Sequence, residues 1–338
     1  MKKVLILGGG GFIGRNITRY LVQRNDCDVT AADIKEDPSW KTLKESSNRF
    51  NYIVADFTDV ESFELLKHSY DEVYHLAAIV GVNRTLKNPE DVIKTNTRLT
   101  MNTLDWISTN PVKKILFASS SENYAGTTDV FNFEVPTSEN VPLCISDIKH
   151  PRWTYAITKI HGESAFLHSA KAKNYGCTIV RYQNIIGPNM GFNHAIPHIV
   201  ERFFNKEKSP FKIYGHDQTR AFCYIDDAVI GTVKAMELNT DGEIFHIGND
   251  QEVTIESLTR YIGELMNYND KYKAAMTYPG SVARRCPNIT KSYEMLNYEP
   301  KIKWKEAVQL TVEWYYEFYS KGDKPKLGGF KPPEETLQ

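Results

Sequence analysis

The chain has 338 residues, of which 41% are hydrophobic and 25% charged, a composition typical of a globular protein with one large domain or two coupled ones. Its net charge of −1 gives no basic field, so we expect no nucleic-acid partner. The apolar run near the N-terminus spans only four residues before glycines follow, too few for a signal peptide or membrane span. Five scattered cysteines show no metal-ligand spacing. We therefore expect a cytoplasmic protein with reduced cysteines, no metal and no membrane partner.

Apolar runs of strand length alternate with amphipathic stretches of helical length through the first half of the chain. Strands are expected at 4–7, 28–33, 52–57, 72–78, 114–120 and 177–182. Helices are expected between them at 12–24, 59–69, 90–109 and 153–174. Continuously apolar strands in a βαβ order predict a parallel sheet covered on both faces. The predicted fold class is α/β, with a doubly wound parallel sheet.

After about residue 185 this alternation stops. Short strands (FKIYG, RAFCYI and EIFHIG) and helices near 195–206, 226–238 and 255–267 follow, with more Pro and Gly. We expect a first domain over 1–184, to which 220–247 partly returns, and a smaller α+β substrate-binding domain over 185–320. The Lys-, Pro- and Gly-rich end predicts a flexible tail over 321–338.

The segment GGGGFIG (residues 8–14) lies between the first strand and the first helix. Its glycines fit both G-x-G-x-x-G and G-x-x-G-x-x-G, although such a run by itself equally indicates a tight turn. Glycine lets the chain approach a pyrophosphate, and the start of the helix offers free N–H groups and a positive dipole end. The residues expected to bind a dinucleotide here are Gly8, Gly11, Phe12, Ile13 and Gly14.

Asp33 ends the second strand, about twenty residues after the glycines. A carboxylate there accepts hydrogen bonds from an adenosine ribose and repels a 2′-phosphate, which favours NAD over NADP, although Lys35 nearby weakens this preference. Asp56 and Phe57 follow the third strand, where they either hold the adenine or cap the strand. Together these features predict a Rossmann domain with NAD as its cofactor.

The segment HPRWTYAITKIHGE (150–163) places Tyr155 and Lys159 at i and i+4, on one helical face. This pair is commonly no more than a surface lysine beside a half-buried tyrosine. As a functional pair, Tyr155 is a general base whose pKa, ordinarily about 10, is lowered by the ammonium and by a positive nicotinamide. Ser120, at the end of a neighbouring strand, shares the proton of a substrate hydroxyl in this interpretation.

Ser120, Tyr155 and Lys159, together with the glycine loop, resemble the extended short-chain dehydrogenases/reductases that modify nucleotide sugars. Four further segments resemble this family in the same order: HLAA (75–78), RYQNIIGPNM (181–190), QTRAFCYIDDAV (218–229) and NITKSYEMLNYEPKI (288–302). The resemblance implies NAD, with Ala77 of HLAA beside it, and a nucleoside-diphosphate sugar. It also implies a homodimer, formed through the helices near 95–107 and 155–170.

The resemblance also implies roles for the substrate-binding residues. Arg220 would bind the diphosphate and Asn184 the sugar phosphate, with Ser121 also among the substrate-binding residues. A surface ion pair for Arg220 and a turn for Asn184 are the simpler alternatives. Enzymes of this family first oxidise the sugar C4 hydroxyl, with Tyr155 taking its proton.

The segment SSSENY (119–124) distinguishes among the reactions of the family. Dehydratases resemble one another in an Asp-Glu pair, whereas this chain has Ser121-Glu122, which is similar to UDP-glucuronate decarboxylases and apiose-forming enzymes. Arg285 stands where those decarboxylases have an arginine, although Arg284 beside it leaves the inward-facing residue open. PRWTY (151–155) is likewise similar to the bacterial decarboxylases of lipid A modification.

The chain departs from the decarboxylases at three positions, which carry Ser120, Asn123 and Cys286 instead of the usual threonine, valine and basic residue. Glu122 is either catalytic, with Arg285, or a structural residue that binds backbone N–H groups in a turn. The leading interpretation is decarboxylation of a sugar acid like UDP-glucuronate. A 4-epimerase follows, then a C4-dehydrogenase, and a non-catalytic dinucleotide sensor is a distant alternative.

Overall fold

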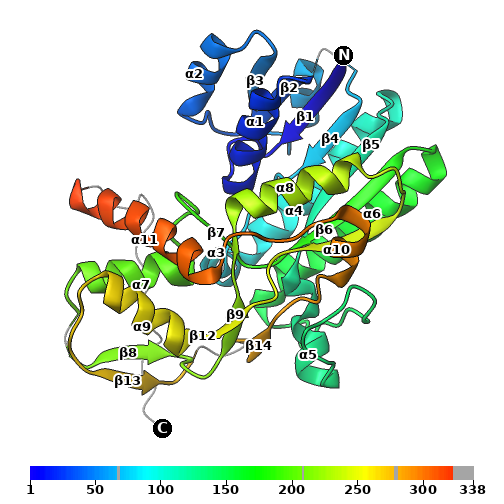
Figure 1. The fold of residues 1–338 in the computed structure, drawn as a ribbon. Helices are drawn as coiled ribbons and strands as arrows, with labels where there is room; N and C mark the ends of the chain where they lie inside the picture. Colours follow the sequence, from blue (N-terminus) through cyan, green and yellow to red (C-terminus); the bar gives the residue numbers. More distant parts are fainter. Residues whose placement is uncertain (67–68, 208, 278–280, 323–338) are drawn as a thin grey trace.

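The computed structural model describes residues 1–66, 69–207, 209–277 and 281–322. Its centre is a seven-stranded parallel sheet with the order β11-β6-β5-β4-β1-β2-β3 (Figure 1). Its strands are β1 (Lys2–Leu7), β2 (Cys27–Asp33), β3 (Phe50–Val54), β4 (Glu72–His75), β5 (Lys114–Ser120), β6 (Gly176–Tyr182) and β11 (Glu243–Ile247). The strand order reverses between β1 and β4, which confirms the predicted doubly wound Rossmann class.

Helices connect the strands and cover the sheet. They are α1 (Phe12–Arg24), α2 (Ser39–Ser46), α3 (Val82–Lys87), α4 (Pro89–Thr109), α5 (Ala125–Phe131), α6 (Thr154–Lys173), α7 (Ala195–Phe204), α8 (Ile225–Glu237), α9 (Ile255–Leu265), α10 (Thr290–Leu296) and α11 (Trp304–Ser320). Short 3₁₀ turns are η1 (Val60–Leu65), η2 (Ser121–Tyr124) and η3 (Pro151–Trp153).

The helix predicted over 59–69 is wrong in type, because the chain forms only the 3₁₀ turn η1 there. The Asp59 carboxylate accepts a hydrogen bond from the Glu61 N–H and so begins the turn. A single buried aromatic, Phe63, fixes the turn to the core, where it packs edge-on against Phe57. Among the described residues of 59–69, Phe63 and Leu66 are the buried ones, and two side chains do not provide the continuous apolar face that stabilises a long helix.

Alternate residues of β1 serve two different cores, which is why the strand is apolar throughout. Val4 and Ile6 pack with residues of α1 and α8, whereas Leu5 and Leu7 pack with residues of α4 and α6. A strand whose two faces are both buried needs apolar side chains at every position. The sheet is therefore the middle one of three layers. The carboxyl ends of its strands lie between the two helical layers.

The second half of the chain adds small sheets beside the large one. Their strands are β7 (Ile185–Ile186), β8 (Phe211–Tyr214), β9 (Thr219–Ala221), β10 (Cys223–Tyr224), β12 (Glu252–Thr254), β13 (Tyr272–Ala275) and β14 (Arg284–Arg285). In Figure 1 the elements α7, α9, β8 and β13 gather at the lower left, away from the large sheet. The later strand β11 returns to the large sheet beside β6. Apart from 321 and 322, the predicted tail (321–338) lies outside the described residues.

Candidate active site

The glycine loop makes the sharp turn from β1 into α1, and three of its glycines, Gly8, Gly9 and Gly14, leave no room for a side chain. Gly8 has φ +85°, and a Cβ on it would lie 2.6 Å from the Ala77 nitrogen. A Cβ on Gly14 would lie 2.0 Å from the Gly8 carbonyl oxygen. α1 begins at Phe12, and its N-cap residue Gly11 is exposed and makes no side-chain capping hydrogen bond. This exposed helix start fits the pyrophosphate of a dinucleotide.

Asp33 lies at the end of β2 beside this loop. Its carboxylate accepts hydrogen bonds from the Gly10 N–H at 3.0 Å and the Lys35 N–H at 3.3 Å. Burial raises the pKa of Asp33, and these backbone hydrogen bonds oppose the rise. The carboxylate is thereby held beside the glycine loop, where it fits a ribose hydroxyl.

Asp56 and Phe57 are both engaged in local structure. The Asp56 carboxylate accepts hydrogen bonds from the N–H and hydroxyl of Thr58, at 2.9 Å and 2.8 Å, and so caps the turn after β3. The Phe57 side chain is buried in the core. A contact between these two residues and adenine therefore stays a prediction.

Ser120, Tyr155 and Lys159 meet where β5 ends against α6. The Lys159 ammonium donates a hydrogen bond to the Ala118 carbonyl at 2.7 Å and lies 5.7 Å from the centre of the Tyr155 ring. Burial lowers the pKa of Lys159 to about 7, although the Glu163 carboxylate opposes this. The three predicted residues are thus neighbours in the structure.

The pKa of Tyr155 is raised in the protein alone, contrary to the lowering predicted from Lys159. Burial is the largest cause and the negative charge of Glu122 adds to it, whereas a hydrogen bond with Ser120 opposes both. Lys159 has itself a lowered pKa and directs its ammonium to the Ala118 carbonyl. In the protein alone, the hydrogen bond with Ser120 is therefore the contact that lowers the pKa of Tyr155.

Glu122 faces arginines rather than the backbone donors of a turn. Its carboxylate binds Arg285 Nη1 at 2.7 Å, and Arg152 Nη2 lies 3.7 Å from its other oxygen. Burial would raise the pKa of Glu122, but the charges of Arg285 and Arg152 and the hydrogen bond from Arg285 lower it to about 2. Within the described part of the chain, Arg285 Nη2 is buried and has no hydrogen-bond partner. Arg284 instead binds Glu252, and its side chain is 53% exposed.

A cleft of about 460 Å³ joins the catalytic residues to the second half of the chain. Among the described residues that line it, Glu122 is the one carboxylate, and the cationic lining residues are Arg152, Arg202, Arg220 and Arg285. Arg202 is already paired with Glu207. The site residues predicted from the sequence that line this cleft are Ser120, Ser121, Glu122, Tyr155, Asn184, Arg220 and Arg285.

Two of these residues come from the segments predicted to bind the substrate. Asn184 has φ +40° and donates its side-chain amide to the Ala221 carbonyl at 3.2 Å, so it also forms part of a turn. Arg220 lies opposite Arg285 in the pairing of β9 with β14. Residues opposite each other in adjacent strands project to the same side of a sheet, which places both side chains toward the cleft.

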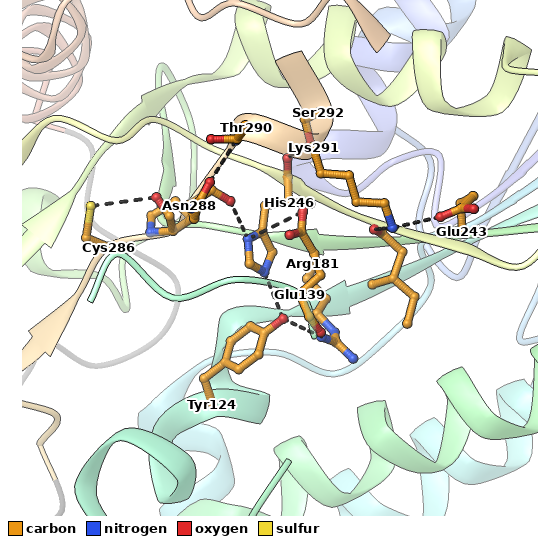
Figure 2. Close-up of polar contacts among 12 residues, drawn as sticks. Tyr124, Glu139, Arg181, Glu243, His246, Cys286, Asn288, Thr290, Lys291 and Ser292 are labelled. Carbon is orange, nitrogen blue, oxygen red and sulfur yellow. Dashed lines mark hydrogen bonds and ion pairs between the residues drawn. The ribbon is translucent and has the colours of Figure 1, made fainter. Parts of the chain in front are cut away.

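The other residues of SSSENY enter a buried polar network that the sequence did not reveal. Glu163 accepts hydrogen bonds from Ser119 at 2.5 Å and from Asn123 at 2.9 Å. Both of its oxygens also bind Arg181, at 2.8 Å and 2.6 Å. Tyr124 continues the network toward His246 (Figure 2). The three consecutive residues Ser120, Ser121 and Glu122 thus line the cleft, and the network holds the residues on either side of them.

Arg152 is a site residue that sequence analysis missed. PRWTY indicated a resemblance, but the position of Arg152 beside Glu122 depends on how η3 packs in the folded chain.

Residues 4–248 match the model of a family described as the NAD dependent epimerase/dehydratase family. The chain belongs to this family. The match spans the glycine loop, Ser120, Tyr155 and Lys159. It confirms the predicted resemblance, the class of short-chain dehydrogenase/reductase enzymes and NAD as the cofactor.

Relatives of this family member include both decarboxylases and epimerases. A UDP-N-acetyl-alpha-D-glucosaminuronate decarboxylase of Bacillus cytotoxicus is 32% identical, over 94% of this chain and 98% of the relative. The UDP-glucuronic acid decarboxylase 3 of Arabidopsis thaliana is 30% identical, over 92% and 88%. A solved structure of a UDP-glucuronic acid 4-epimerase from Bacillus cereus, in complex with UDP-glucuronic acid and NAD, superposes with a TM-score of 0.81. It is 25% identical and covers 94% of this chain and 100% of that one.

Proposed function

We propose that this family member decarboxylates a UDP-linked uronic acid, such as UDP-glucuronate or its 2-acetamido counterpart. The observation that carries the proposal is the 2.7 Å ion pair of Arg285 with Glu122 in the cleft beside Tyr155. Two curated relatives that are 30% or more identical are named as decarboxylases of such acids. In this proposal residues 1–184 hold NAD and residues 185–320 mainly hold the sugar nucleotide.

The charge of the cleft favours an anionic substrate. Arg152, Arg220 and Arg285 all lower the pKa of Glu122 through their positive charges, so three guanidinium groups act on one carboxylate. Such an excess of positive charge suits a ligand with a diphosphate and a carboxylate. Arg285 Nη2 is buried without a partner within the described chain, and a substrate carboxylate would satisfy it.

The chemistry begins at the sugar C4 hydroxyl. Ser120 hydrogen-bonds that hydroxyl, and Tyr155 takes its proton. When bound, NAD supplies the acceptor for the hydride. A ketone at C4 makes the C5 carboxylate a β-keto acid, which loses CO2 readily because the electrons of the broken C–C bond enter the ketone as an enolate. C5 then takes a proton from solvent, which restores the C4 ketone.

Glu122 orients Arg285 in this mechanism rather than delivering a proton. With a pKa of about 2 it is ionised at neutral pH, so it accepts hydrogen bonds and has no proton to donate. Glu122 binds Nη1 of the rigid Arg285 guanidinium, so Nη2 of the same group points away from Glu122. This assigns the substrate carboxylate to Arg285.

The second candidate function is 4-epimerisation of the same acid. It is favoured by the similarity to the solved 4-epimerase with UDP-glucuronic acid and by Ser120, Tyr155 and Lys159, which suffice for that reaction. A net C4-dehydrogenase would use the same three residues. The three reactions share their first step and differ in their products.

The deciding experiment is mass spectrometry of the products that the purified protein and NAD form from UDP-glucuronate, its 2-acetamido counterpart and the corresponding neutral sugars. Loss of CO2 from an acid supports the proposal. An unchanged mass at a new retention time establishes the epimerase, and loss of two hydrogens with an equal amount of NADH establishes the dehydrogenase. No turnover on any sugar would favour a sensor.

We also propose a cytoplasmic homodimer formed through α4 and α6. α4 and α6 pack side by side, and the exposed Ile93 and Met101 of α4 are spaced i, i+8 on one face. Within the described residues no helix is long and apolar enough to span a bilayer. Met101→Glu should convert the dimer to a monomer in sedimentation experiments, whereas Met276→Glu, at an 88% exposed position elsewhere, should not. A monomeric wild-type protein would refute the dimer.

A further inference from the structure

The ion pair of Glu122 with Arg285 joins two segments that are far apart in the sequence. Glu122 lies in η2, and Arg285 lies in β14, 163 positions later. Neither segment belongs to the large sheet. η2 follows directly from β5, so the sheet fixes its place, whereas the position of β14 relative to it depends on other contacts, some of which Figure 2 shows around His246.

His246 connects the two segments through its ring nitrogens. Nε2 lies 2.8 Å from the hydroxyl oxygen of Tyr124, two residues after Glu122. Nδ1 lies 2.9 Å from the carbonyl oxygen of Asn288, three residues after Arg285. His246 itself lies in β11 and is fully buried, so the rigid sheet supports both contacts.

The hydrogen-bond donors and acceptors around the His246 ring allow one arrangement of protons. The Asn288 carbonyl only accepts, so Nδ1 carries the hydrogen and donates it. Nε2 is then an acceptor and receives the Tyr124 hydroxyl hydrogen, while the Tyr124 oxygen accepts from Arg181 Nη1. Burial lowers the pKa of His246 and raises that of Tyr124, which keeps both residues neutral, as this arrangement requires.

A second set of contacts holds the same region together. The Thr137 N–H donates to the Cys286 carbonyl at 2.9 Å, and the Asn288 N–H donates to the Thr137 carbonyl at 2.8 Å. The carboxylate of Glu139, two residues after Thr137, accepts a hydrogen bond from the backbone N–H of His246 at 3.0 Å. The strand residue His246 is thus the common support of the segments around Glu122, Thr137 and Arg285.

We infer that His246 is a positioning residue, whose two ring hydrogen bonds hold the Arg285 segment in register with the Glu122 segment. This inference rests on the proposed decarboxylation for its kinetic consequence. The hydride step depends on Ser120, Tyr155 and Lys159, which make none of these contacts. Loss of the His246 bridge should therefore impair CO2 release selectively.

Two substitutions test the contacts of the two ring nitrogens separately. His246→Asn keeps an amide donor near Nδ1 for Asn288, whereas His246→Gln keeps an acceptor for Tyr124 and loses that donor. We expect His246→Gln to lower kcat for CO2 release by up to about 100-fold, because small displacements of a reacting group are costly. KM for the sugar nucleotide and the formation of NADH in a single turnover should change little. His246→Asn should keep most of the activity, because Arg181 still holds the Tyr124 hydroxyl.

Hydrogen exchange gives a readout that does not depend on activity. His246→Gln should increase amide exchange in 284–288 relative to wild type, and His246→Asn should not. A parallel loss of NADH formation and CO2 release would overturn the inference, as would full activity of His246→Gln or equal defects in both variants. If His246→Gln does not fold, Tyr124→Phe takes its place as a variant that keeps the Nδ1 contact with Asn288, so exchange in 284–288 should stay at the wild-type rate, and increased exchange there would overturn the inference. Failure of both to fold would show a purely structural role.

The inference and the proposed function can fail separately. If the wild-type protein releases no CO2 from any sugar acid, the proposed function fails. The exchange of 284–288 in the two His246 variants still decides whether this histidine positions the Arg285 segment.

Discussion

The guanidinium of Arg285 and the carboxylate of Glu122 meet at 2.7 Å in the cleft, while the neighbouring Arg284 turns outward to Glu252. Successive residues of a strand project to opposite faces, so only one arginine of the pair can reach the site. Arg285 is the one that reaches the site, because it lies opposite the cleft residue Arg220 in the pairing of β14 with β9.

This relationship predicts opposite outcomes for the same substitution at adjacent positions. Arg285→Lys keeps a positive charge but loses the planar fork that binds Glu122 with one nitrogen and a carboxylate with the other. We expect kcat for CO2 release to fall about 100-fold, as for the loss of a preorganised donor, while NADH formation persists. Arg284→Lys, at the exposed position, is the matched control and should retain wild-type kinetics. Equal defects in both variants would contradict the assignment.

Glu122→Gln should shift the pH dependence of C4 oxidation. The negative charge of Glu122 raises the pKa of Tyr155, and a neutral amide removes this effect. Tyr155 must lose its proton to act as a base, so the rising limb of kcat/KM for NADH formation should move to lower pH. Glu90→Gln, which changes an exposed charge on α4, should leave the limb in place. A limb that stayed in place would show that Glu122 does not act on Tyr155, and one that moved upward would contradict the expected sign.

Much of the fold could be predicted because local patterns determined it. The amphipathic period and the glycine loop predicted a helix over 12–24, and α1 has those bounds. The helical period over 59–69 instead gives the 3₁₀ turn η1, because the buried side chains described there, Phe63 and Leu66, make too small an apolar face for a long helix.

The details of the site depend on contacts between distant segments. The sequence suggested both Glu122 and Arg285, but not that Arg152 also faces this carboxylate or that Arg284 turns away. Those facts follow from strand register and from the packing of η3. The role of His246 was likewise invisible, because an isolated histidine in an apolar strand carries no pattern.

Substitution of Gly14 and Gly11 in the glycine loop should weaken NAD binding to different degrees. A Cβ on Gly14 would lie 2.0 Å from the Gly8 carbonyl oxygen, so Gly14→Ala must displace the backbone of the loop. A Cβ on Gly11 would lie 3.2 Å from the same atom, which requires only a small adjustment. Overpacking costs about 1–3 kcal/mol, so we expect NAD affinity to fall by about 5- to 140-fold in Gly14→Ala, and by less in Gly11→Ala. Calorimetric titration with NAD measures both, and a reversed order would contradict the geometry.

Lys159 predicts a pH dependence of the stability of the protein without NAD. Its pKa is about 7 in the folded protein and about 10.4 in an unfolded chain. Between these values the unfolded chain binds a proton that the folded protein does not, so the free energy of unfolding rises with pH. Below about pH 7 the folded protein also binds this proton, and the rise in the free energy of unfolding is absent. Between the two pKa values the free energy of unfolding rises by at most about 1.4 kcal/mol per pH unit.

Lys159→Met removes this titrating group and keeps an unbranched side chain. The variant should gain stability over the wild type most strongly near pH 7, and the difference should shrink as the pH rises toward 10. Urea unfolding of both proteins across this range measures the difference, and Lys41→Met, at a 73% exposed side chain, serves as the control. A difference that stayed constant with pH would show that the lysine remains charged in the fold, stabilised by Glu163 and the Ala118 carbonyl.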